Sequence, residues 1–318
     1  MSHVLVTGGA GYIGSIAAFQ LLEAGHNVTI FDDLSTGHLE SIDSRARFVE
    51  ASLLDISKLR GAMSGCDSVM HFGGKSLVGE SVAKPELYMQ INVEGSRNVL
   101  DAMKSEGVSR IVFSSSAATY GEPSAAPISE DYEALPTNPY GVTKLRVDEL
   151  LSERATVDGF AATSLRYFNV AGALNTGSKW LGEFHNPETH LIPKVLQATV
   201  SNPLKVFGND WPTPDGTCIR DYVHVVDLIE AHITALGQLV NPGHCIINLG
   251  SGSGYSVQEV ISAAEKILGR SIPTEIDSRR AGDPAVLVAS IEKAQKELNW
   301  SPTRSLESMI QDSHKAAR

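Results

Sequence analysis

The feature that most restricts the fold of this chain is a glycine-rich turn near its N-terminus, TGGAGYIG at residues 7–14. A short apolar run precedes the turn and a helical pattern follows it, which predicts a strand, a turn and a helix. Gly8 permits the tight turn, Gly11 lets the backbone approach a phosphate, and Gly14 lets the helix pack closely on the strand. The N-terminus of such a helix attracts anions through its amides and its dipole. The turn is therefore a candidate dinucleotide site.

The next apolar run decides between a turn without a ligand and a dinucleotide site. Asp32 follows this run, which begins at Asn27, and lies 18 residues after Gly14. In dinucleotide-binding folds an acidic residue at an offset of about 20 residues binds the adenosine ribose. A carboxylate there repels a 2′-phosphate, and no arginine follows in Asp33-Leu34-Ser35. The pattern favours NAD over NADP.

Strand-like and helix-like segments alternate over the first half of the chain. Apolar, β-rich runs occur at 4–6, 27–31, 68–71, 110–113 and 163–167, and helical patterns at 12–23, about 86–104 and about 140–153. Such alternation is typical of βαβ units. We therefore expect an α/β fold, with a Rossmann-type doubly wound parallel sheet.

A change in composition near residue 170 predicts a second, smaller lobe. Gly, Asn, Thr and Pro are dense up to residue 187, and further prolines interrupt the chain up to residue 214. Long loops of this kind are usually functional. We expect a dinucleotide-binding domain at 1–170 and a C-terminal α/β substrate lobe at 171–318. The segment near 220–250 reads as strand, helix and strand, and we expect it to return to the first domain.

Composition narrows the partners and the compartment. The chain has 26 Lys and Arg against 37 Asp and Glu, a formal charge of −11, which argues against a general nucleic-acid surface. No apolar run reaches the roughly 18–20 residues of a membrane helix. The chain enters a strand directly after Met1-Ser2-His3, which argues against a signal peptide. Its three cysteines are far apart, as expected for reduced thiols. We expect a cytoplasmic protein.

A tyrosine and a lysine stand four residues apart in YGVTK at 140–144, on one face of a predicted helix. Free tyrosine has a pKa of about 10, and the ammonium of Lys144, joined by a positive nicotinamide ring, is expected to lower the pKa of Tyr140. Ser116 follows a strand in a run of serines and is placed to hydrogen-bond the same substrate hydroxyl. Such Tyr–Lys pairs are common on helix surfaces. After a dinucleotide motif and a strand that ends in serines, the pattern favours a catalytic trio.

Motifs along nearly the whole chain carry a resemblance. They are TGGAGYIGS at 7–15, HFGG at 71–74, VGESVAKP at 78–85, SSSAATYG at 114–121, NPYGVTK at 138–144, LRYFNVAGA at 165–173, HNPETHLIP at 185–193, VFGNDWPTPDGTCIRDYVHVVDL at 206–228, NLGSGSGYS at 248–256, RRAGDP at 279–284 and ELNW at 297–300. With them the chain resembles the extended short-chain dehydrogenase/reductase family, and within it the group of UDP-glucose (UDP-galactose) 4-epimerases. The glycine turn marks only the superfamily, whereas RYFN at 166–169 and the segment 206–228 are more specific to that group.

The resemblance assigns roles to individual residues. It implies that Ser116, Tyr140 and Lys144 are catalytic. It implies NAD contacts from Gly8, Gly11, Tyr12, Ile13, Gly14, Asp32, Ser52, Leu53, Phe72, Gly73, Gly74, Tyr140, Lys144 and Phe168. It implies UDP-sugar contacts from Ser116, Tyr140, Asn169, His190, Leu191, Val206, Phe207, Arg220, Arg280, Asp283 and Leu287. The planar forks of Arg220 and Arg280 suit diphosphate oxygens, an interpretation we favour over ion pairs with Asp221 or Asp283.

Three positions near the predicted NAD site depart from the family pattern. Ser52 replaces an acid near the adenine, Lys75-Ser76 displaces the usual lysine, and Ile91 stands where an asparagine usually precedes Asn92. These departures bear on how tightly NAD is retained, and they leave the catalytic trio intact.

No metal site is expected. His185, His190 and His224 are the histidines that suggest one, but they share no ligand spacing with a cysteine. We interpret them as loop and core histidines.

The activity that the resemblance implies is the interconversion of UDP-glucose and UDP-galactose. In this mechanism Tyr140 takes the proton of the sugar 4-hydroxyl while hydride passes from C4 to NAD, and the 4-keto sugar turns about its diphosphate and takes the hydride back. The alternatives are an epimerase of a UDP-N-acetylhexosamine, UDP-pentose or UDP-uronate, a net NAD-dependent nucleotide-sugar dehydrogenase or reductase, and a non-catalytic NAD-binding protein. A 4,6-dehydratase is disfavoured, because Ala117-Ala118 stand where that branch carries an Asp-Glu pair.

The resemblance also implies a homodimer and a gate on sugar size. The dimer would pair helices near 86–104 and 140–153 from two copies. The gate is position 287, where a large tyrosine disfavours an N-acetyl group and a small residue admits it. Leu287 is intermediate in size. We therefore expect UDP-glucose and UDP-galactose as the preferred pair, with weak activity on N-acetyl sugars.

Overall fold

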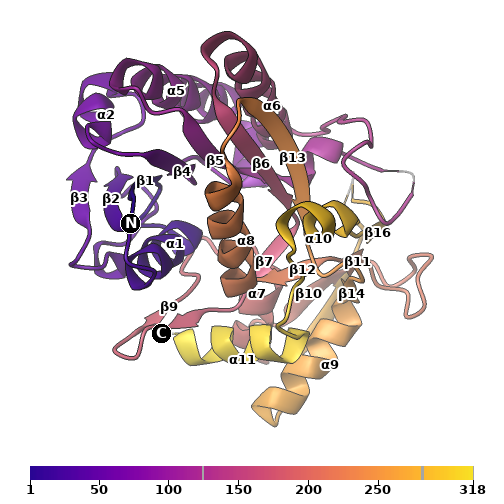
Figure 1. Cartoon of the computed structure of the whole chain (residues 1–318). Helices are drawn as coiled ribbons and strands as arrows, with labels where there is room; N and C mark the ends of the chain where they lie inside the picture. Colours follow the sequence, from indigo (N-terminus) through magenta and orange to yellow (C-terminus); the bar gives the residue numbers. More distant parts are fainter. Residues whose placement is uncertain (124, 281–282, 318) are drawn as a thin grey trace. The chain divides into compact units, whose positions relative to one another are not determined.

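The computed structural model describes residues 1–123, 125–280 and 283–317, and Figure 1 traces the chain from its N-terminus to its C-terminus. The chain divides into two compact units. Unit 1 comprises residues 1–121, 134–166 and 229–247, and unit 2 comprises residues 122–133, 167–228 and 248–318. Both units are therefore built from segments that lie far apart in the sequence.

Unit 1 is organised around a seven-stranded sheet with the strand order β13-β6-β5-β4-β1-β2-β3. The pairs β1–β2, β1–β4, β2–β3 and β4–β5 are parallel. The strand order reverses at β1, which confirms the predicted doubly wound, Rossmann-type fold. The strands are β1 (His3–Thr7), β2 (Asn27–Asp32), β3 (Arg47–Glu50), β4 (Ser68–His71), β5 (Arg110–Ser116), β6 (Ala161–Tyr167) and β13 (Gly243–Leu249).

Helices cover both faces of this sheet. On one face, Leu5 of β1 shares a core cluster with Leu59, Leu100 and Leu151 from three different helices. The neighbours of Leu5 in the strand point to the other face and are also fully buried, as expected for a parallel sheet covered on both sides. The helices are α1 (Tyr12–Glu23), η1 (Leu39–Ser41), α2 (Ile56–Met63), α3 (Val78–Ala83), α4 (Pro85–Tyr88), η2 (Met89–Glu94), α5 (Gly95–Glu106), η3 (Ala117–Tyr120), α6 (Pro139–Asp158) and α8 (Val225–Gln238).

The helix expected near 86–104 contains a wider turn that its sequence did not predict. Helical structure runs from α4 into α5, but η2 between them is a π-helix. Asn92 lies in this segment, where its Oδ1 accepts a hydrogen bond from the Lys75 backbone over 2.7 Å and its Nδ2 donates to Thr143 Oγ1 over 3.0 Å. The irregular turn coincides with these side-chain bonds to a loop and to α6, a common setting for π-helical turns.

Helix α6 continues beyond the predicted end near Glu153. Arg154 pairs with Asp158 one turn further on, at 2.8 Å, and this i,i+4 pair supports the added turn. The helix then ends at Gly159, whose φ of +72° suits a glycine cap. The extra residues were missed because the segment 154–158 shows little apolar periodicity.

Unit 2 is a smaller α/β arrangement. Its core joins Val260 of α9 and Met309 of α11 to Ile192 of α7 and Val206 of β10. Strand β10 pairs with β15, and β11 pairs with β14 and β16. The elements are β7 (Asn169–Ala171), β8 (Leu174–Asn175), β9 (Trp180–Leu181), α7 (Leu191–Gln197), β10 (Leu204–Phe207), β11 (Ile219–Arg220), β12 (Tyr222–His224), β14 (Tyr255–Ser256), α9 (Val257–Leu268), β15 (Thr274–Asp277), β16 (Val286–Leu287), α10 (Glu292–Leu298) and α11 (Leu306–Ala316).

Three further features of the described residues complete the fold. Within the described part of the chain, every helix is too short or too polar to span a membrane. Cys66, Cys218 and Cys245 form no disulfide among the described residues. The segment near 220–250 forms strand, helix and strand as predicted, in β12, α8 and β13.

Candidate active site

The glycine turn of unit 1 has the geometry that its sequence predicts. Gly8 adopts a φ of +68°, and a Cβ there would lie 2.7 Å from the backbone nitrogen of Gly73, so this position requires glycine. A Cβ on Gly14 would lie 2.1 Å from the carbonyl oxygen of Gly8, which confirms the close packing of α1 on the turn. Helix α1 begins after Gly11 without a side-chain cap. Its N-terminal amides and dipole are therefore of the kind that bind a phosphate.

Asp32 ends β2, and the backbone around it fixes its carboxylate. Oδ2 accepts a hydrogen bond from the Ala10 nitrogen over 3.0 Å, and Oδ1 accepts one from the Leu34 nitrogen over 2.8 Å. Burial raises the pKa of Asp32, and these two hydrogen bonds oppose the rise. A carboxylate held in this way has its orientation set before a ribose hydroxyl binds. Together with the glycine turn, it fits a dinucleotide.

Other members of the predicted NAD set lie around the same turn. The nitrogen of Gly73 donates to Thr7 Oγ1 over 3.3 Å, and a Cβ on Gly73 would lie 3.1 Å from Cδ1 of Leu53. The structure therefore brings Leu53 and Gly73 to Gly8. Of the remaining members, Tyr12, Ile13, Ser52 and Phe72 are half-buried in unit 1, Gly74 is exposed there, and Phe168 is half-buried in unit 2.

A chain of buried polar side chains beneath the turn escaped prediction. His71 Nδ1 lies 2.6 Å from Thr7 Oγ1, and His71 Nε2 lies 2.8 Å from Ser96 Oγ. Ser96 in turn donates to the backbone carbonyl of Asn92. Because Thr7 directly precedes the glycines, this chain ties the turn to helix α5. The HFGG motif marked His71, but no pattern in the sequence indicated its partners.

The buried state of His71 predicts a pH dependence of stability. Burial, aided by Lys144, lowers its pKa to about 3 from 6.5. Between these values the unfolded chain binds a proton that the folded chain does not, so stability falls as pH falls below about 6.5. His71 alone is expected to remove about 1.4 kcal/mol of unfolding free energy per pH unit in this window. Urea unfolding of the wild type and of His71→Gln at pH 4.5 to 6.5 measures this, and equal slopes in the two proteins would contradict it.

Ser116, Tyr140 and Lys144 come together in unit 1. Ser116 ends β5, Tyr140 lies in the first turn of α6, and their side chains are hydrogen-bonded to each other. The Lys144 Nζ donates to the carbonyl of Ser114 over 2.7 Å. The same Nζ lies 4.7 Å from the ring centre of Phe113 and 5.8 Å from that of Tyr140. The structure thus assembles a phenol, a hydroxyl and a buried ammonium group.

Burial acts on both ionisable groups of the trio, Tyr140 and Lys144. Burial raises the pKa of Tyr140, and the hydrogen bond with Ser116 opposes the rise. Burial also lowers the pKa of Lys144 to about 8, against the opposing charge of Asp148. In the protein without NAD, burial is the larger effect, because it disfavours the charged form of both groups. The lowering of the phenol pKa by Lys144 together with a nicotinamide ring stays a prediction.

Two further buried charges support the helix that carries Tyr140 and Lys144. Asp148 of α6 and Arg166 of β6 form an ion pair of 2.9 Å, with side chains only 3% and 4% exposed. Ser115 Oγ donates to the same carboxylate oxygen over 3.1 Å. The pair ties α6 to the sheet and so positions the trio. RYFN at 166–169 signalled the family, but nothing in it revealed that its arginine pairs with Asp148.

In unit 2 the structure brings Arg220, Asp283 and Leu287 together. Arg220 of β11 lies opposite Leu287 of β16 in the strand register. Its Nη1 donates to the carbonyl of Pro284 over 2.9 Å, and its Nη2 lies 3.6 Å from Asp283 Oδ2. The ion pair with Asp283, which the sequence disfavoured, is therefore present, because the β11–β16 pairing carries residue 283 to the arginine. At 3.6 Å it is loose, and it leaves the guanidinium able to meet an oxyanion.

Other members of the predicted UDP-sugar set lie elsewhere in unit 2. The Arg280 guanidinium lies 3.8 Å from the ring centre of Phe207. Val206 is buried in the core cluster on which Leu191 packs, so Val206 can offer a ligand only backbone atoms. Nδ2 of Asn169 donates to the Asp221 carbonyl over 3.1 Å, next to Arg220. Nδ1 of His190 contacts Glu183, which leaves its other ring nitrogen for a ligand.

Comparison with known proteins identifies the family. The model described as "NAD dependent epimerase/dehydratase family" matches residues 4–250. The chain belongs to this family. It is 50% identical to the UDP-glucose 4-epimerase of Corynebacterium glutamicum, over 97% of this chain and 94% of that protein. It is 46% identical to the UDP-glucose 4-epimerase of Streptomyces lividans, over 97% and 94% of the two chains.

Solved structures of this epimerase/dehydratase family have the same fold. The UDP-glucose 4-epimerase of Brucella ovis in complex with NAD superposes with a TM-score of 0.94 at 41% identity, over 99% of this chain and 98% of that one. The UDP-glucose 4-epimerase of Bifidobacterium longum in complex with NAD⁺ and UDP gives a TM-score of 0.91 at 36% identity, over 99% and 98%. The UDP-Glc/GlcNAc 4-epimerase of Campylobacter jejuni gives 0.86 at 36% identity, over 99% and 98%.

Proposed function

We propose that this member of the epimerase/dehydratase family interconverts UDP-glucose and UDP-galactose, with NAD as a recycled cofactor. The observation that carries the proposal is the arrangement of Ser116, Tyr140 and Lys144 in the same unit as the dinucleotide turn. The epimerase names of the relatives, and the NAD and UDP in the solved neighbours, support it. In this proposal unit 1 holds NAD and unit 2 holds the UDP-sugar.

The trio would act on the sugar 4-hydroxyl. Tyr140 would take the proton of this hydroxyl when hydride leaves C4 and return it when hydride comes back. Ser116 would share the hydrogen bond and favour the phenolate, and the Lys144 ammonium would stabilise the negative charge that develops on the phenol. The chemistry that NAD supplies when bound is removal and return of hydride at C4. The glycine turn at 7–14 and Asp32 would hold the cofactor, with the rest of the predicted NAD set around them.

Unit 2 would hold the nucleotide firmly and the sugar loosely. Arg220 and Arg280 would bind diphosphate oxygens in their planar forks. Asn169, His190, Leu191, Phe207 and Asp283, and the backbone at Val206, would complete the UDP-sugar site. Epimerisation needs both faces of the 4-keto sugar presented to one cofactor, so the binding free energy has to come mostly from the UDP part.

The decisive experiment follows conversion of UDP-galactose to UDP-glucose by the purified protein, with and without added NAD. Conversion without stoichiometric use of NAD is the expected result. Stoichiometric formation of NADH would instead establish a net dehydrogenase, and binding of NAD without conversion of either sugar would establish a non-catalytic protein. A wild type that prefers UDP-pentoses or UDP-uronates would keep the chemistry and change the substrate.

Position 287 should set the tolerance for a 2-acetamido group. We expect Leu287→Ala to raise, and Leu287→Tyr to lower, the kcat/KM for UDP-N-acetylglucosamine relative to that for UDP-glucose. Overpacking by the acetamido group costs about 1–3 kcal/mol, so the wild type should discriminate by roughly 5- to 150-fold. The measurement is this kcat/KM ratio in the three proteins. A ratio that stays constant, or a wild type that prefers the N-acetyl sugar, would remove Leu287 from the role of gate.

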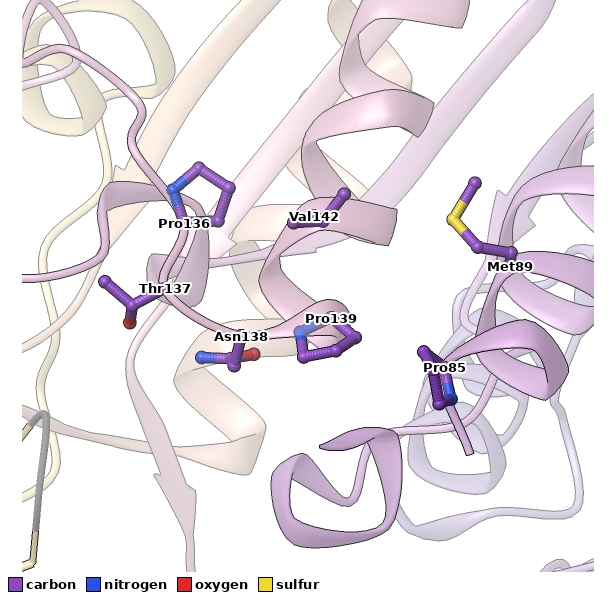
Figure 2. A pocket seen from close by; sticks show the side chains of 7 residues that line it. All are labelled: Pro85, Met89, Pro136, Thr137, Asn138, Pro139 and Val142. Atoms are coloured by element: carbon purple, nitrogen blue, oxygen red, sulfur yellow. The ribbon is translucent and has the colours of Figure 1, made fainter. Parts of the chain in front are cut away.

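We also propose a cytoplasmic homodimer. Cysteines that form no disulfide, as Cys66, Cys218 and Cys245 do not among the described residues, are typical of the reducing cytoplasm. Unit 1 carries an apolar pocket of about 380 Å³, which Figure 2 shows between the start of α6 and the segment around Met89. Its lining residues are Pro85, Met89, Pro136, Thr137, Asn138, Pro139 and Val142. Met89 and Val142 are 39% and 38% exposed. The pocket overlaps the two helices through which the resemblance implies dimerisation, so a second copy is its proposed occupant.

A charge in this pocket should weaken the dimer. Met89→Glu would place two carboxylates in one apolar interface, and burial of a charge without a partner is strongly unfavourable. Sedimentation velocity should show the mass of two chains for the wild type and of one chain for Met89→Glu at micromolar concentration. Val157→Glu is the matched control, because Val157 is 71% exposed in the last turn of α6, away from the pocket. A monomeric wild type, or equal dissociation of both variants, would refute this interface.

A further inference from the structure

Four side chains that commonly bind metals gather just before helix α7 in unit 2. They are Glu183, His185, Glu188 and His190, and one ligand atom of each lies within 4.8 Å of all the others. Glu183 Oε1 lies 2.9 Å from His185 Nδ1 and also contacts His190 Nδ1. His190 Nδ1 lies 3.7 Å from Glu188 Oε1. Both imidazoles thus direct their Nδ1 atoms toward the carboxylate of Glu183.

Burial makes this cluster unlike a surface group of acids. The side chains of Glu183 and Glu188 are 7% and 10% exposed, and a buried carboxylate needs a compensating cation or hydrogen bonds. Within residues 1–123, 125–280 and 283–317, the ion-pair partners of both carboxylates are imidazoles. Glu188 Oε1 also accepts hydrogen bonds from the backbone nitrogens of Thr189 and His190 over 2.7 Å and 2.8 Å. Nδ1 of His185 is itself buried, and its neighbour in this part of the chain is Glu183 Oε1 at 2.9 Å. A cation at the centre would bind both carboxylates and both Nδ1 atoms at once.

We propose that Glu183, His185, Glu188 and His190 form a structural zinc site. Zinc binds imidazole nitrogen at about 2.0–2.1 Å and carboxylate oxygen at about 2.0–2.2 Å, and structural sites have four protein ligands in a tetrahedron. Ligand atoms in such a tetrahedron lie about 3.3 Å apart, a value between the 2.9 Å and 3.7 Å separations observed here. Magnesium and calcium prefer oxygen ligands throughout, so the two imidazoles select a transition metal.

The pattern is local in the sequence, E-x-H-x-x-E-x-H over residues 183–190. The spacing of histidines with cysteines does not reveal this pattern, because the other two candidate ligands are the carboxylates of Glu183 and Glu188. Zinc would close the segment into a ring of eight residues that leads directly into α7 (Leu191–Gln197). The N-terminal turn of α7, which packs in the core of unit 2 through Ile192, would then be held in place. This role goes beyond the proposed epimerase activity and does not depend on it.

The test uses the untagged full-length protein, treated with a chelator and dialysed. Calorimetric titration with Zn²⁺ and elemental analysis should give one tightly bound zinc per chain, and Tm should rise with zinc. His185→Asn and Glu183→Gln should each weaken binding at least about 10-fold, since even partners of metal ligands contribute 10- to 100-fold. His314→Asn is the matched control, because His314 is an exposed histidine on α11, and it should bind zinc like the wild type.

Several outcomes would overturn the site. They are a wild type that binds less than half a zinc per chain, variants that bind as tightly as the wild type, and a control that loses as much affinity as the variants do. Circular dichroism establishes that each variant is folded, and Glu188→Gln replaces any variant that is not. Cobalt gives a second readout, since tetrahedral Co²⁺ absorbs strongly in the visible region. Visible bands that persist in His185→Asn would place the metal elsewhere.

Discussion

Replacement of Tyr140 by phenylalanine is expected to lower turnover of UDP-galactose by at least about 100-fold, with the fold and NAD binding unchanged. Phenylalanine keeps the ring that packs at the start of α6 and removes only the hydroxyl that is hydrogen-bonded to Ser116. A positioned proton-transfer group contributes about 10²- to 10⁴-fold to a rate. Neither Ser116 nor Lys144 occupies the position of the Tyr140 hydroxyl, so neither is expected to replace it in proton transfer. The measurement is kcat under saturating substrate, together with NAD binding by fluorescence.

The control for this variant is another tyrosine. Tyr132→Phe removes a hydroxyl from a half-buried tyrosine of unit 2 that has no role in the proposed mechanism, so its turnover should stay near that of the wild type. If Tyr140→Phe turns over within about 10-fold of the wild type, Tyr140 is not the acid–base group. If it loses NAD as well as activity, the tyrosine acts on cofactor binding instead of proton transfer.

The sequence predicted the parts of this site that depend on local spacing. A Gly-rich turn between a strand and a helix can adopt few geometries, and the structure confirms both the φ of Gly8 and the close approach at Gly14. The four-residue spacing of Tyr140 and Lys144 likewise places both on one face of a helix. The bounds of β4, Ser68–His71, agreed with the prediction because a short apolar run gives a clear strand signal.

What the sequence did not predict depends on partners distant along the chain. His71 meets Thr7 and Ser96, and Asp148 meets Arg166, across separations that no periodicity encodes. The effect of burial on the pKa of Tyr140 was missed for the same reason. The spacing of two residues gives their mutual charge effect, but burial is a property of the whole core, and here it is the larger effect.

The buried pair of Asp148 and Arg166 leads to the largest expected change in stability. Arg166→Met should lower the unfolding free energy by about 3–5 kcal/mol, because it leaves the Asp148 carboxylate buried without its cation. That carboxylate is 3% exposed, and Ser115 is the donor that would remain to Oδ2. Oδ1 has no hydrogen-bond partner among the described residues even in the wild type, so the remaining compensation comes from Ser115 and from the charge of Lys144. Urea unfolding at pH 7 measures the change.

The double variant separates the loss of a partner from the value of the pair. Asp148→Leu/Arg166→Met replaces both charges by apolar groups of similar size, and such replacements of buried ion pairs are often neutral or stabilising. The double variant should therefore be more stable than Arg166→Met, with an unfolding free energy closer to that of the wild type. In a double-mutant cycle this difference appears as a large coupling energy between the two residues. Additive effects of the two substitutions would show that the charges do not depend on each other. Helix α6 carries Tyr140 and Lys144. If the double variant regains stability while its turnover stays low, the main role of the ion pair is to position α6, and its contribution to the stability of the fold is smaller.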